Sequence, residues 1–221
     1  MKMAIIGGTG RQGPGLALRF AATGLEVLIG SRSLDKAKRI AGEISAKLKA
    51  AGIEGAGEVS GLTNEAAAKL AQIGCLTIPY PTYRTALPPL RAELQGKILI
   101  DVTVPFVGYK PPEIERPSGG SAAEEVQTLL GDQVKVVGAF KTTPASLLAA
   151  LERKLAADIL VCGDDPQAKA EVIRLIERLD VRAFDAGPLK NSQVLEGLTA
   201  MLLSLNVKYK RRALDIRLTG I

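Results

Sequence analysis

The chain has 221 residues, 47% of them hydrophobic, and a formal net charge of +6. This length allows one sizeable core, or one large domain with a small appendage. No apolar run approaches the roughly 18 residues that a membrane span needs. A strand-like segment begins directly in "MKMAIIGG", so we expect no targeting peptide. We expect a cytoplasmic protein in which Cys75 and Cys162 are buried, reduced thiols.

The positive charge is not accompanied by a nucleic-acid-binding motif, and aromatic residues make up only 4% of the chain. Attraction of small polyanionic ligands explains the charge equally well. The chain contains no histidine, which excludes Ser-His-Asp triads, imidazole bases and zinc sites built on histidine. We therefore expect small-molecule ligands, with no nucleic acid, no membrane and no metal.

Apolar, β-branched runs alternate with stretches of helical periodicity along most of the chain. The predicted strands are 2–7, 25–31, 75–79, 97–104, 134–140, 158–163 and 181–187. The predicted helices are 14–23, 34–50, 64–72, 82–94, 121–130, 145–154 and 166–179. This interleaving predicts an α/β fold, a doubly wound and mainly parallel sheet of the Rossmann type with helices on both faces. The Pro- and Gly-rich stretch 105–120 is predicted to be a surface loop.

From Asn191 the pattern changes to one long helix candidate, "NSQVLEGLTAMLLSLNVKYKRR". Its middle is apolar almost all round and its end is basic. Such a helix must be covered by the body of the domain or by a second subunit. We therefore divide the chain into a dinucleotide-binding domain, 1–187, and a small C-terminal helical subdomain, 188–221.

A glycine-rich turn, "GGTGRQGPG", follows the first predicted strand and opens the first helix. Gly8, Gly10 and Gly13 fit the pattern G-x-G-x-x-G, which is weak alone but stronger in this strand–turn–helix context. We expect Gly8 to permit the tight turn, Gly10 to let a pyrophosphate approach the backbone, and Gly13 to allow close helix packing. Backbone amides and the positive helix end would hold the anion. The alternative is a glycine-rich turn that binds nothing.

The segment "VLIGSRSLDKAK", 27–38, carries the signal for the nucleotide. An NAD site usually has a carboxylate at the end of the second strand, which binds the ribose hydroxyls and would repel a 2′-phosphate. Here that position holds Ser31 and Arg32, with Lys36 one helical turn later. A hydroxyl, a guanidinium fork and an ammonium suit a dianionic phosphate. The segment predicts NADP rather than NAD, unless both cations are ordinary solvated charges at a helix start.

Three later strand ends, "TIPYP", "VTVPF" and "KTTPA", each place Thr or Val before a proline. We expect them to wall the nicotinamide, although "KTTPA" also fits a simple helix start. The candidate acids and bases at this edge are Lys141, Tyr80, Tyr83 and Asp101. Carbonyl reduction needs a proton partner, for which Lys141 is the best candidate. Hydride transfer between two ring cofactors needs mainly stacking, distance and exclusion of water, which suits a site without histidine.

The chain resembles the NADP-dependent reductases of coenzyme F-420, an 8-hydroxy-5-deazaflavin. The resemblance covers nearly the whole chain. It rests, in order, on "IIGGTGRQGPGLALRFA", "IGSRSLDKA", "LTIPY", "GKILIDVTVP", "GGSAAE", "ILVCGDD", "DAGPLKNS" and "IRLTGI". It implies hydride exchange between NADPH and the deazaflavin co-substrate, with the rings face to face at the carboxyl edge. It also implies a homodimer, for which the apolar helix 194–207 is a suitable interface.

The resemblance assigns the site residues by matching position. It places Thr9, Gly10, Arg11 and Gln12 at the pyrophosphate, and Ser31, Arg32 and Lys36 at the 2′-phosphate. Thr77, Ile78, Pro79, Val104 and Ala145 would line the nicotinamide side. Lys141, Thr143, Thr199 and Leu214 would lie towards the deazaflavin. The basic residues Lys208, Lys210, Arg211 and Arg212 form either a solvated helix end or a contact for an anionic coenzyme tail.

Two other functions fit the same scaffold. One is an NADP-dependent imine or keto-acid reductase with Lys141 as its proton donor. The other is a non-catalytic module that senses NADP.

Overall fold

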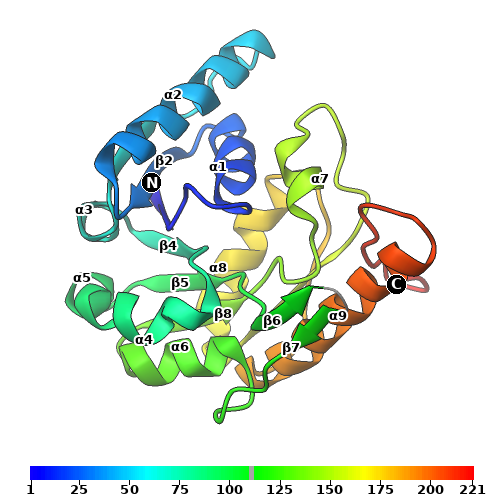
Figure 1. Ribbon diagram of the computed structural model, residues 1–221. Helices are drawn as coiled ribbons and strands as arrows, with labels where there is room; N and C mark the ends of the chain where they lie inside the picture. The colour runs from blue at the N-terminus through cyan, green and yellow to red at the C-terminus, as the bar shows by residue number, and fades with distance from the viewer. Residues whose placement is uncertain (110–111) are drawn as a thin grey trace.

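The computed structural model describes residues 1–109 and 112–221. Residues 110–111, which belong to the predicted loop 105–120, lie outside the described residues. An eight-stranded sheet, in the order β10-β9-β8-β5-β4-β1-β2-β3, forms the centre of the molecule (Figure 1). Its strands are β1 (Lys2–Ile6), β2 (Glu26–Ser31), β3 (Val59–Thr63), β4 (Ile73–Leu76), β5 (Ile98–Asp101), β8 (Lys135–Gly138), β9 (Ile159–Gly163) and β10 (Ala183–Asp185).

Helices connect most of these strands. They are α1 (Gly13–Ala22), α2 (Leu34–Ala50), α3 (Asn64–Leu70), α4 (Tyr83–Ala86), α5 (Arg91–Leu94), α6 (Ala122–Leu130), α7 (Ala145–Ala149), α8 (Pro166–Glu177) and α9 (Ser192–Lys208). Short 3₁₀ turns cover Tyr80–Thr82, Pro88–Leu90 and Leu189–Asn191. A separate hairpin pairs β6 (Phe106–Tyr109) with β7 (Pro112–Ile114). Within the described residues, no helix is both long and apolar enough to cross a membrane.

The strand order confirms a Rossmann-type doubly wound sheet. The segment β3-β2-β1-β4-β5-β8 has the usual order of six parallel strands in that fold. The chain moves outward from β1 to β3 and then returns to β4 on the other side of β1. This topological switch lies between β1 and β4, and ligands of such sheets bind beyond the carboxyl ends of the strands there. β9 pairs antiparallel with β8, and β10 pairs parallel with β9.

Both faces of the sheet are covered, as the continuous apolar strands predict. Alternate residues of β1 belong to different cores. Met3 and Ile5 pack with side chains of α1, α2 and α8. Ala4 and Ile6 pack with side chains of α3 to α6. The buried β1 is therefore the central strand on which both layers rest, and it feeds directly into the glycine-rich turn.

The structure departs from the predicted elements where local signals are weak or interrupted. β3 was not predicted, because this edge strand is Ser-, Gly- and Thr-containing and only half-buried. The hairpin β6–β7 lies within the predicted loop 105–120. The predicted helix 82–94 is divided by the 3₁₀ turn at Pro88–Leu90, since proline cannot continue a helix hydrogen-bond ladder. The predicted helix 145–154 ends at Ala149.

The C-terminal helix prediction is confirmed in its main part. α9 packs beside β7 and α6 and ends at Lys208, so it excludes the last four residues of the predicted helix. Residues 213–221 then form an irregular segment, which we call the strap, shown in red beside the end of α9 in Figure 1.

Candidate functional site

The glycine-rich turn has the geometry of a dinucleotide-binding loop. Two glycines permit the tight turn: Gly7 has a left-handed backbone (φ 72°), and a Cβ on Gly8 would lie 2.8 Å from Ile5 O. The Gly8 N–H closes the turn by donating to Ile5 O (3.1 Å) and Gly30 O (2.8 Å). A Cβ on Gly13 would lie 2.5 Å from Gly8 Cα, so only glycine permits this close packing. A Cβ on Gly10 would meet nothing nearer than 3.6 Å, which leaves this backbone accessible to a ligand.

The next residues of the loop carry unsatisfied polar atoms. Gly10 and Arg11 are exposed, whereas Thr9 and Gln12 are half-buried. The Gln12 amide donates to Thr143 O (3.3 Å), so the start of α1 adjoins the turn before α7. Within the described residues, Gln12 Oε1 and Thr143 Oγ1 are buried without a hydrogen-bond partner. Because buried polar atoms are rarely left unpaired, these two fit a polar ligand held between the loop and the turn.

The end of β2 brings the three predicted 2′-phosphate residues within one turn of the start of α2. Ser31 is 6% exposed, and its hydroxyl accepts from the Ser33 N–H (3.2 Å) and lies 3.4 Å from Thr9 Oγ1. Ser33 caps α2 by accepting from the Lys36 N–H (3.4 Å). Arg32 and Lys36 are exposed, and neither side chain has a hydrogen-bond or ion-pair partner among the described residues. A helix N-terminus with two uncommitted cations fits an anion.

The predicted nicotinamide residues occupy the ends of neighbouring strands. Thr77, Ile78 and Pro79 follow β4, Val104 follows β5, and Ala145 begins α7 after β8. The Thr77 hydroxyl donates to Ile6 O (2.9 Å), and Ile78 contacts Gly7 so closely that a Cβ there would clash. The end of β4 is thereby joined to the glycine-rich turn. The structure thus brings the predicted pyrophosphate and nicotinamide residues to one edge.

A strained turn after β8 shapes the far side of this edge. Phe140 has φ 55°, a left-handed conformation that is unusual for an aromatic residue and is enriched at functional sites. Its carbonyl accepts from the Thr143 N–H (3.2 Å), and its ring packs edge-to-face on Phe20 of α1 (centroids 6.0 Å apart). The packing fixes the turn, which carries Lys141 and Thr143 to the edge.

Arg19 joins the two walls of the site. Its guanidinium, on α1, donates to the carbonyl oxygens of Leu148 (3.0 Å), Leu147 (2.7 Å), Ala150 (2.7 Å) and Arg153 (2.8 Å). These carbonyls belong to α7 and the loop that follows it. Arg19 is only 6% exposed, so the contact is part of the core. A buried contact therefore joins the helix that begins at the glycine-rich turn to the helix that begins at Ala145.

A buried cluster of charges underlies the same edge. The Lys141 ammonium donates to Asp101 Oδ2 (2.8 Å), Glu196 Oε1 (2.9 Å) and Thr103 O (2.7 Å). The side chains of Lys141, Asp101 and Glu196 are 0%, 0% and 2% exposed. The Tyr83 hydroxyl donates to Asp101 Oδ1 (2.7 Å). An ammonium has three hydrogens, so these three acceptors engage all of them and leave none for a bound substrate.

Burial and charge act in opposite directions on this cluster. Burial lowers the pKa of Lys141, but Asp101 and Glu196 outweigh burial and raise it overall. Burial also raises the pKa of Glu196, and the Lys141 ammonium offsets only part of that effect. Glu196 additionally accepts from the Ala122 N–H at the start of α6 (3.1 Å). It was not among the predicted site residues, and its only signal was a carboxylate within an apolar helix.

The other candidate acids at the edge are also engaged. The Tyr80 hydroxyl donates to Glu125 Oε2 (2.6 Å), and burial followed by this carboxylate raises the pKa of Tyr80. Burial raises the pKa of Tyr83 as well, with Asp101 adding to the effect. Among the described residues, none of Lys141, Tyr80, Tyr83 and Asp101 has the uncommitted proton that carbonyl reduction would require.

The remaining residues predicted for the deazaflavin side come from α9 and the strap. The Thr199 hydroxyl donates to Lys141 O (3.0 Å) and ties α9 to the turn after β8. The Leu214 N–H donates to Asn206 Oδ1 (3.1 Å), which holds the start of the strap against α9. Lys208, Lys210, Arg211 and Arg212 are all exposed at the end of α9.

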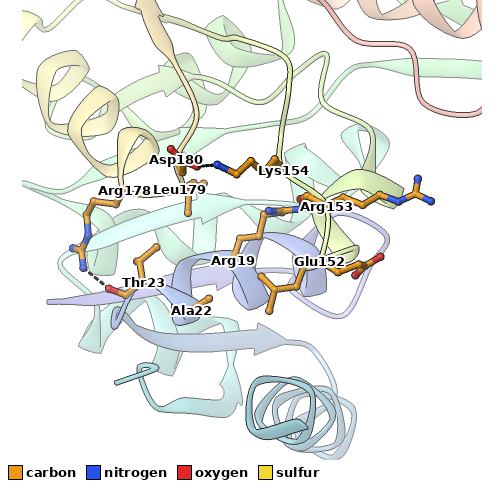
Figure 2. Close-up of a pocket in the computed structure, with 10 residues that line it drawn as sticks. Arg19, Ala22, Thr23, Glu152, Arg153, Lys154, Arg178, Leu179 and Asp180 are labelled. Atoms are coloured by element: carbon orange, nitrogen blue, oxygen red, sulfur yellow. Dashed lines mark hydrogen bonds and ion pairs between the residues drawn. The ribbon is translucent and has the colours of Figure 1, made fainter. Parts of the chain in front are cut away.

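A cavity of about 260 Å³ lies elsewhere on the molecule (Figure 2). It is lined at the end of α1 by Arg19 and Thr23, and further by residues 151–154 and 178–180. Lys154 pairs with Asp180 across it (2.7 Å). The glycine-rich turn is at the other end of α1, and no predicted site residue lines this cavity.

Comparisons with known proteins identify the family to which the chain belongs. Residues 2–105 match the family described as NADP oxidoreductase, coenzyme F420-dependent. The F420-dependent NADP reductase of Methanocaldococcus jannaschii is 42% identical over 225 residues, covering 100% of this chain and 99% of that protein. The enzyme of the same name from Methanothermobacter thermautotrophicus is 38% identical, covering 100% and 96%.

Solved structures extend the likeness to the fold. A protein from Arthrobacter sp. FB24 superposes with a TM-score of 0.82 at 26% identity over 100% of both chains. An imine reductase from Bacillus cereus has a TM-score of 0.62 at 18% identity, covering 95% of this chain and 62% of that one, which shows a shared fold alone. By its full-length identity to the archaeal enzymes, the chain belongs to the family of F420-dependent NADP reductases.

Proposed function

We propose that this protein transfers a hydride between NADP(H) and the deazaflavin coenzyme F-420. The observation that carries the proposal is the full-length match to F420-dependent NADP reductases, at 38–42% identity. The geometry agrees, because a dinucleotide-binding loop lies beside a strand end with two cations and no carboxylate. NADP and the deazaflavin are accordingly its cofactor and co-substrate.

The nucleotide side of the site follows from the edge geometry. In our proposal the amides of the glycine-rich turn, from Gly8 to Gly13, hold the pyrophosphate. The side chains of Ser31, Arg32 and Lys36 hold the 2′-phosphate. Gln12 Oε1 and Thr143 Oγ1 are buried and unpartnered within the described residues. In our proposal Gln12 orients a polar group of the bound nucleotide and Thr143 one of the deazaflavin. The nicotinamide ring supplies the hydride when NADPH is bound.

The deazaflavin side consists of the turn after β8, α9 and the strap, and we propose that residues 188–221 form most of it. The protein's task there is to stack the two rings and exclude water. Lys141 holds Asp101 and Glu196 together beneath the rings and does not deliver a proton, because its three hydrogens are bound inside the protein. This arrangement favours ring-to-ring transfer over an imine or keto-acid reductase that uses Lys141 as its acid.

The test is direct. Purified protein is mixed with oxidised coenzyme F-420 and either NADPH or NADH at equal concentration, and the visible band of the deazaflavin is followed. We expect rapid bleaching with NADPH and far slower bleaching with NADH. NADPH binding without bleaching would contradict the proposal and favour a nucleotide sensor. Turnover of imines or keto acids without bleaching would favour the related reductases.

We further propose that two copies of the chain associate through α9. Val194 (63% exposed), Met201 (52%) and Val207 (69%) are apolar side chains exposed along this helix. Val194 and Met201 are seven residues apart and share one face of the helix, whereas Val207 lies on another face near its end. Paired exposed apolar side chains on one helix face suit an interface. Met201→Glu is expected to convert a dimer into a monomer, as measured by light scattering, and a monomeric wild-type protein would contradict the proposal.

A cytoplasmic location is consistent with Cys75 and Cys162 being free and buried.

A further inference from the structure

The strap, residues 213–221, has no helix or strand and is held by a few specific hydrogen bonds. The Asp158 N–H donates to Ile216 O (2.9 Å), and the Leu218 N–H donates to Asp158 Oδ2 (2.6 Å). Arg182 donates through Nη2 to Leu218 O (2.7 Å). Both backbone groups of Leu218 are therefore bound by one pair of side chains, Asp158 and Arg182.

Asp158 and Arg182 form a two-pronged ion pair. Arg182 Nε lies 2.8 Å from Asp158 Oδ1, and Arg182 Nη2 lies 2.7 Å from Asp158 Oδ2. The Asp158 side chain is 2% exposed, while that of Arg182 is 40% exposed. Burial raises the pKa of Asp158, but Arg182 and the Leu218 N–H outweigh burial, so its pKa is below the ordinary value. Planar, charge-assisted pairs of this kind fix geometry as well as adding energy.

The sheet topology places this pair next to the ring site. In the antiparallel pair β8–β9, Gly138 is opposite Cys162 and Val137 is opposite Gly163. Because β9 runs antiparallel to β8, its start at Ile159 lies at the edge where β8 ends, and this edge also carries the turn with Lys141, Thr142 and Thr143. Asp158 therefore lies at the same edge of the sheet.

The strap reaches the same turn. Burial raises the pKa of Asp215, and the Ile216 N–H (2.9 Å from Oδ1) and the nearby Thr142 side chain offset only part of that effect. Within the described residues, Asp215 Oδ2 is buried without a hydrogen-bond partner. Asp215 lies between Leu214, which is bound to Asn206, and Ile216, which is bound to Asp158. An unpaired carboxylate oxygen at this position suits a ligand with an N–H or O–H group.

We propose that Asp158 and Arg182 are positioning residues for the second substrate. The pair holds the strap against the turn after β8, so that Leu214 and Asp215 close the side of the site where the deazaflavin ring binds. The nucleotide side, formed by the glycine-rich turn and the end of β2, does not depend on it. The inference rests on the proposed function for the identity of the ring ligand, but the anchoring of the strap can be measured independently.

The experiment compares four variants with the wild-type protein. Arg182→Met breaks the pair, deletion of residues 213–221 removes the strap, and a third variant combines both changes. Arg174→Met is the matched control, since Arg174 forms an exposed ion pair with Glu171 on α8 (2.5 Å) away from the strap. Hydrogen exchange by mass spectrometry follows the peptide 213–221. Fluorescence titration measures binding of NADP⁺ alone, and of oxidised coenzyme F-420 to the protein saturated with NADP⁺, a pair that cannot react.

For Arg182→Met we expect faster exchange in the strap and roughly tenfold weaker binding of the oxidised coenzyme, since a charge-assisted hydrogen bond contributes about 1.5 kcal/mol or more. NADP⁺ binding should change less than about twofold. Deletion of the strap should weaken coenzyme binding at least as much, and adding Arg182→Met to the deletion should change it no further.

Three outcomes would overturn the inference. The first is a loosened strap with unchanged coenzyme binding, because the strap would then not serve the site. The second is an equal effect of Arg182→Met with and without the strap, because the pair would then act by another route. The third is unchanged exchange, because the pair would not anchor the strap. If wild-type protein binds NADP⁺ but not the oxidised coenzyme, the proposed function fails, while the exchange result still decides the anchoring.

Discussion

Replacing Lys141 by methionine tests the buried cluster most severely. The substitution keeps an unbranched side chain one atom shorter but removes the ammonium. This leaves the Asp101 and Glu196 carboxylates, 0% and 2% exposed, without their cation. Removing one partner of a buried ion pair typically costs about 3–5 kcal/mol, because the remaining charge is buried and uncompensated. We expect a loss of that size in the free energy of unfolding, measured by urea denaturation at neutral pH.

A matched control and a rescue variant make this result interpretable. Lys135→Met removes an exposed lysine whose nearest carboxylate oxygen, on Asp165, is 3.7 Å away, and should cost less than about 1 kcal/mol. Adding Glu196→Gln to Lys141→Met removes one of the two stranded charges and should restore part of the loss. A loss below about 1 kcal/mol for Lys141→Met, equal to that of the control, would refute a desolvated and tightly paired cluster.

The cluster also predicts the sign of a pH dependence. Glu196 has a raised pKa in the folded protein, so the folded state binds its proton more tightly than the unfolded state does. Its contribution to stability is therefore greatest at low pH and is lost as the pH rises from the unfolded value, about 4.3, through the folded value. Loss of the Lys141 ammonium should raise the pKa of Glu196 further and so enlarge this pH dependence. We expect Lys141→Met to lose less free energy of unfolding, relative to the wild-type protein, at about pH 5 than at about pH 8. A larger loss at the lower pH would contradict a raised pKa for Glu196.

Two further predictions concern the nucleotide. Arg32→Ala should weaken NADPH binding by roughly 10- to 150-fold and leave NADH binding nearly unchanged. The control Arg39→Ala, further along α2, should change the binding of neither nucleotide. Equal losses of NADPH and NADH binding for Arg32→Ala in a calorimetric titration would refute the 2′-phosphate pocket. Gly13→Ala should lower the melting temperature, because its Cβ would lie 2.5 Å from Gly8 Cα. Gly10→Ala should preserve the melting temperature but weaken NADPH binding, because its Cβ has room in the protein yet lies where the pyrophosphate is expected. A lower melting temperature for Gly10→Ala, with NADPH binding unchanged, would contradict the assigned roles.

The parts that follow local rules were predictable from the sequence. The alternation of apolar strands with amphipathic helices predicts the doubly wound sheet, because parallel strands buried on both faces need continuous apolar runs. The glycine spacing predicts the turn, although the positive φ is at Gly7 and not at Gly8. The adjacent glycine in "GGTG" was the available signal for that shift.

The parts that depend on distant contacts were not predictable. Asp101 and Glu196 are 40 and 55 residues from Lys141, and nothing local indicates that their side chains meet it. The sequence therefore indicates Lys141 as a proton donor for a substrate, whereas in the structure all three of its ammonium hydrogens are bound by protein oxygens. Edge strand β3 and the hairpin β6–β7 escaped detection because they lack the long apolar runs of central strands. The antiparallel pairing of β9, which brings Asp158 to the carboxyl edge of the sheet, is likewise a property of the tertiary fold.

In the proposed reaction a hydride passes directly from one ring to the other at the carboxyl edge of this sheet. The most direct measurement uses NADPH that carries deuterium at the transferred position, in ordinary water, with oxidised coenzyme F-420 as acceptor. Mass spectrometry of the reduced coenzyme should find one deuterium in each molecule when the matching face of the nicotinamide is labelled. Reduced coenzyme without deuterium, whichever face of the nicotinamide is labelled, would contradict direct transfer and the site proposed for it.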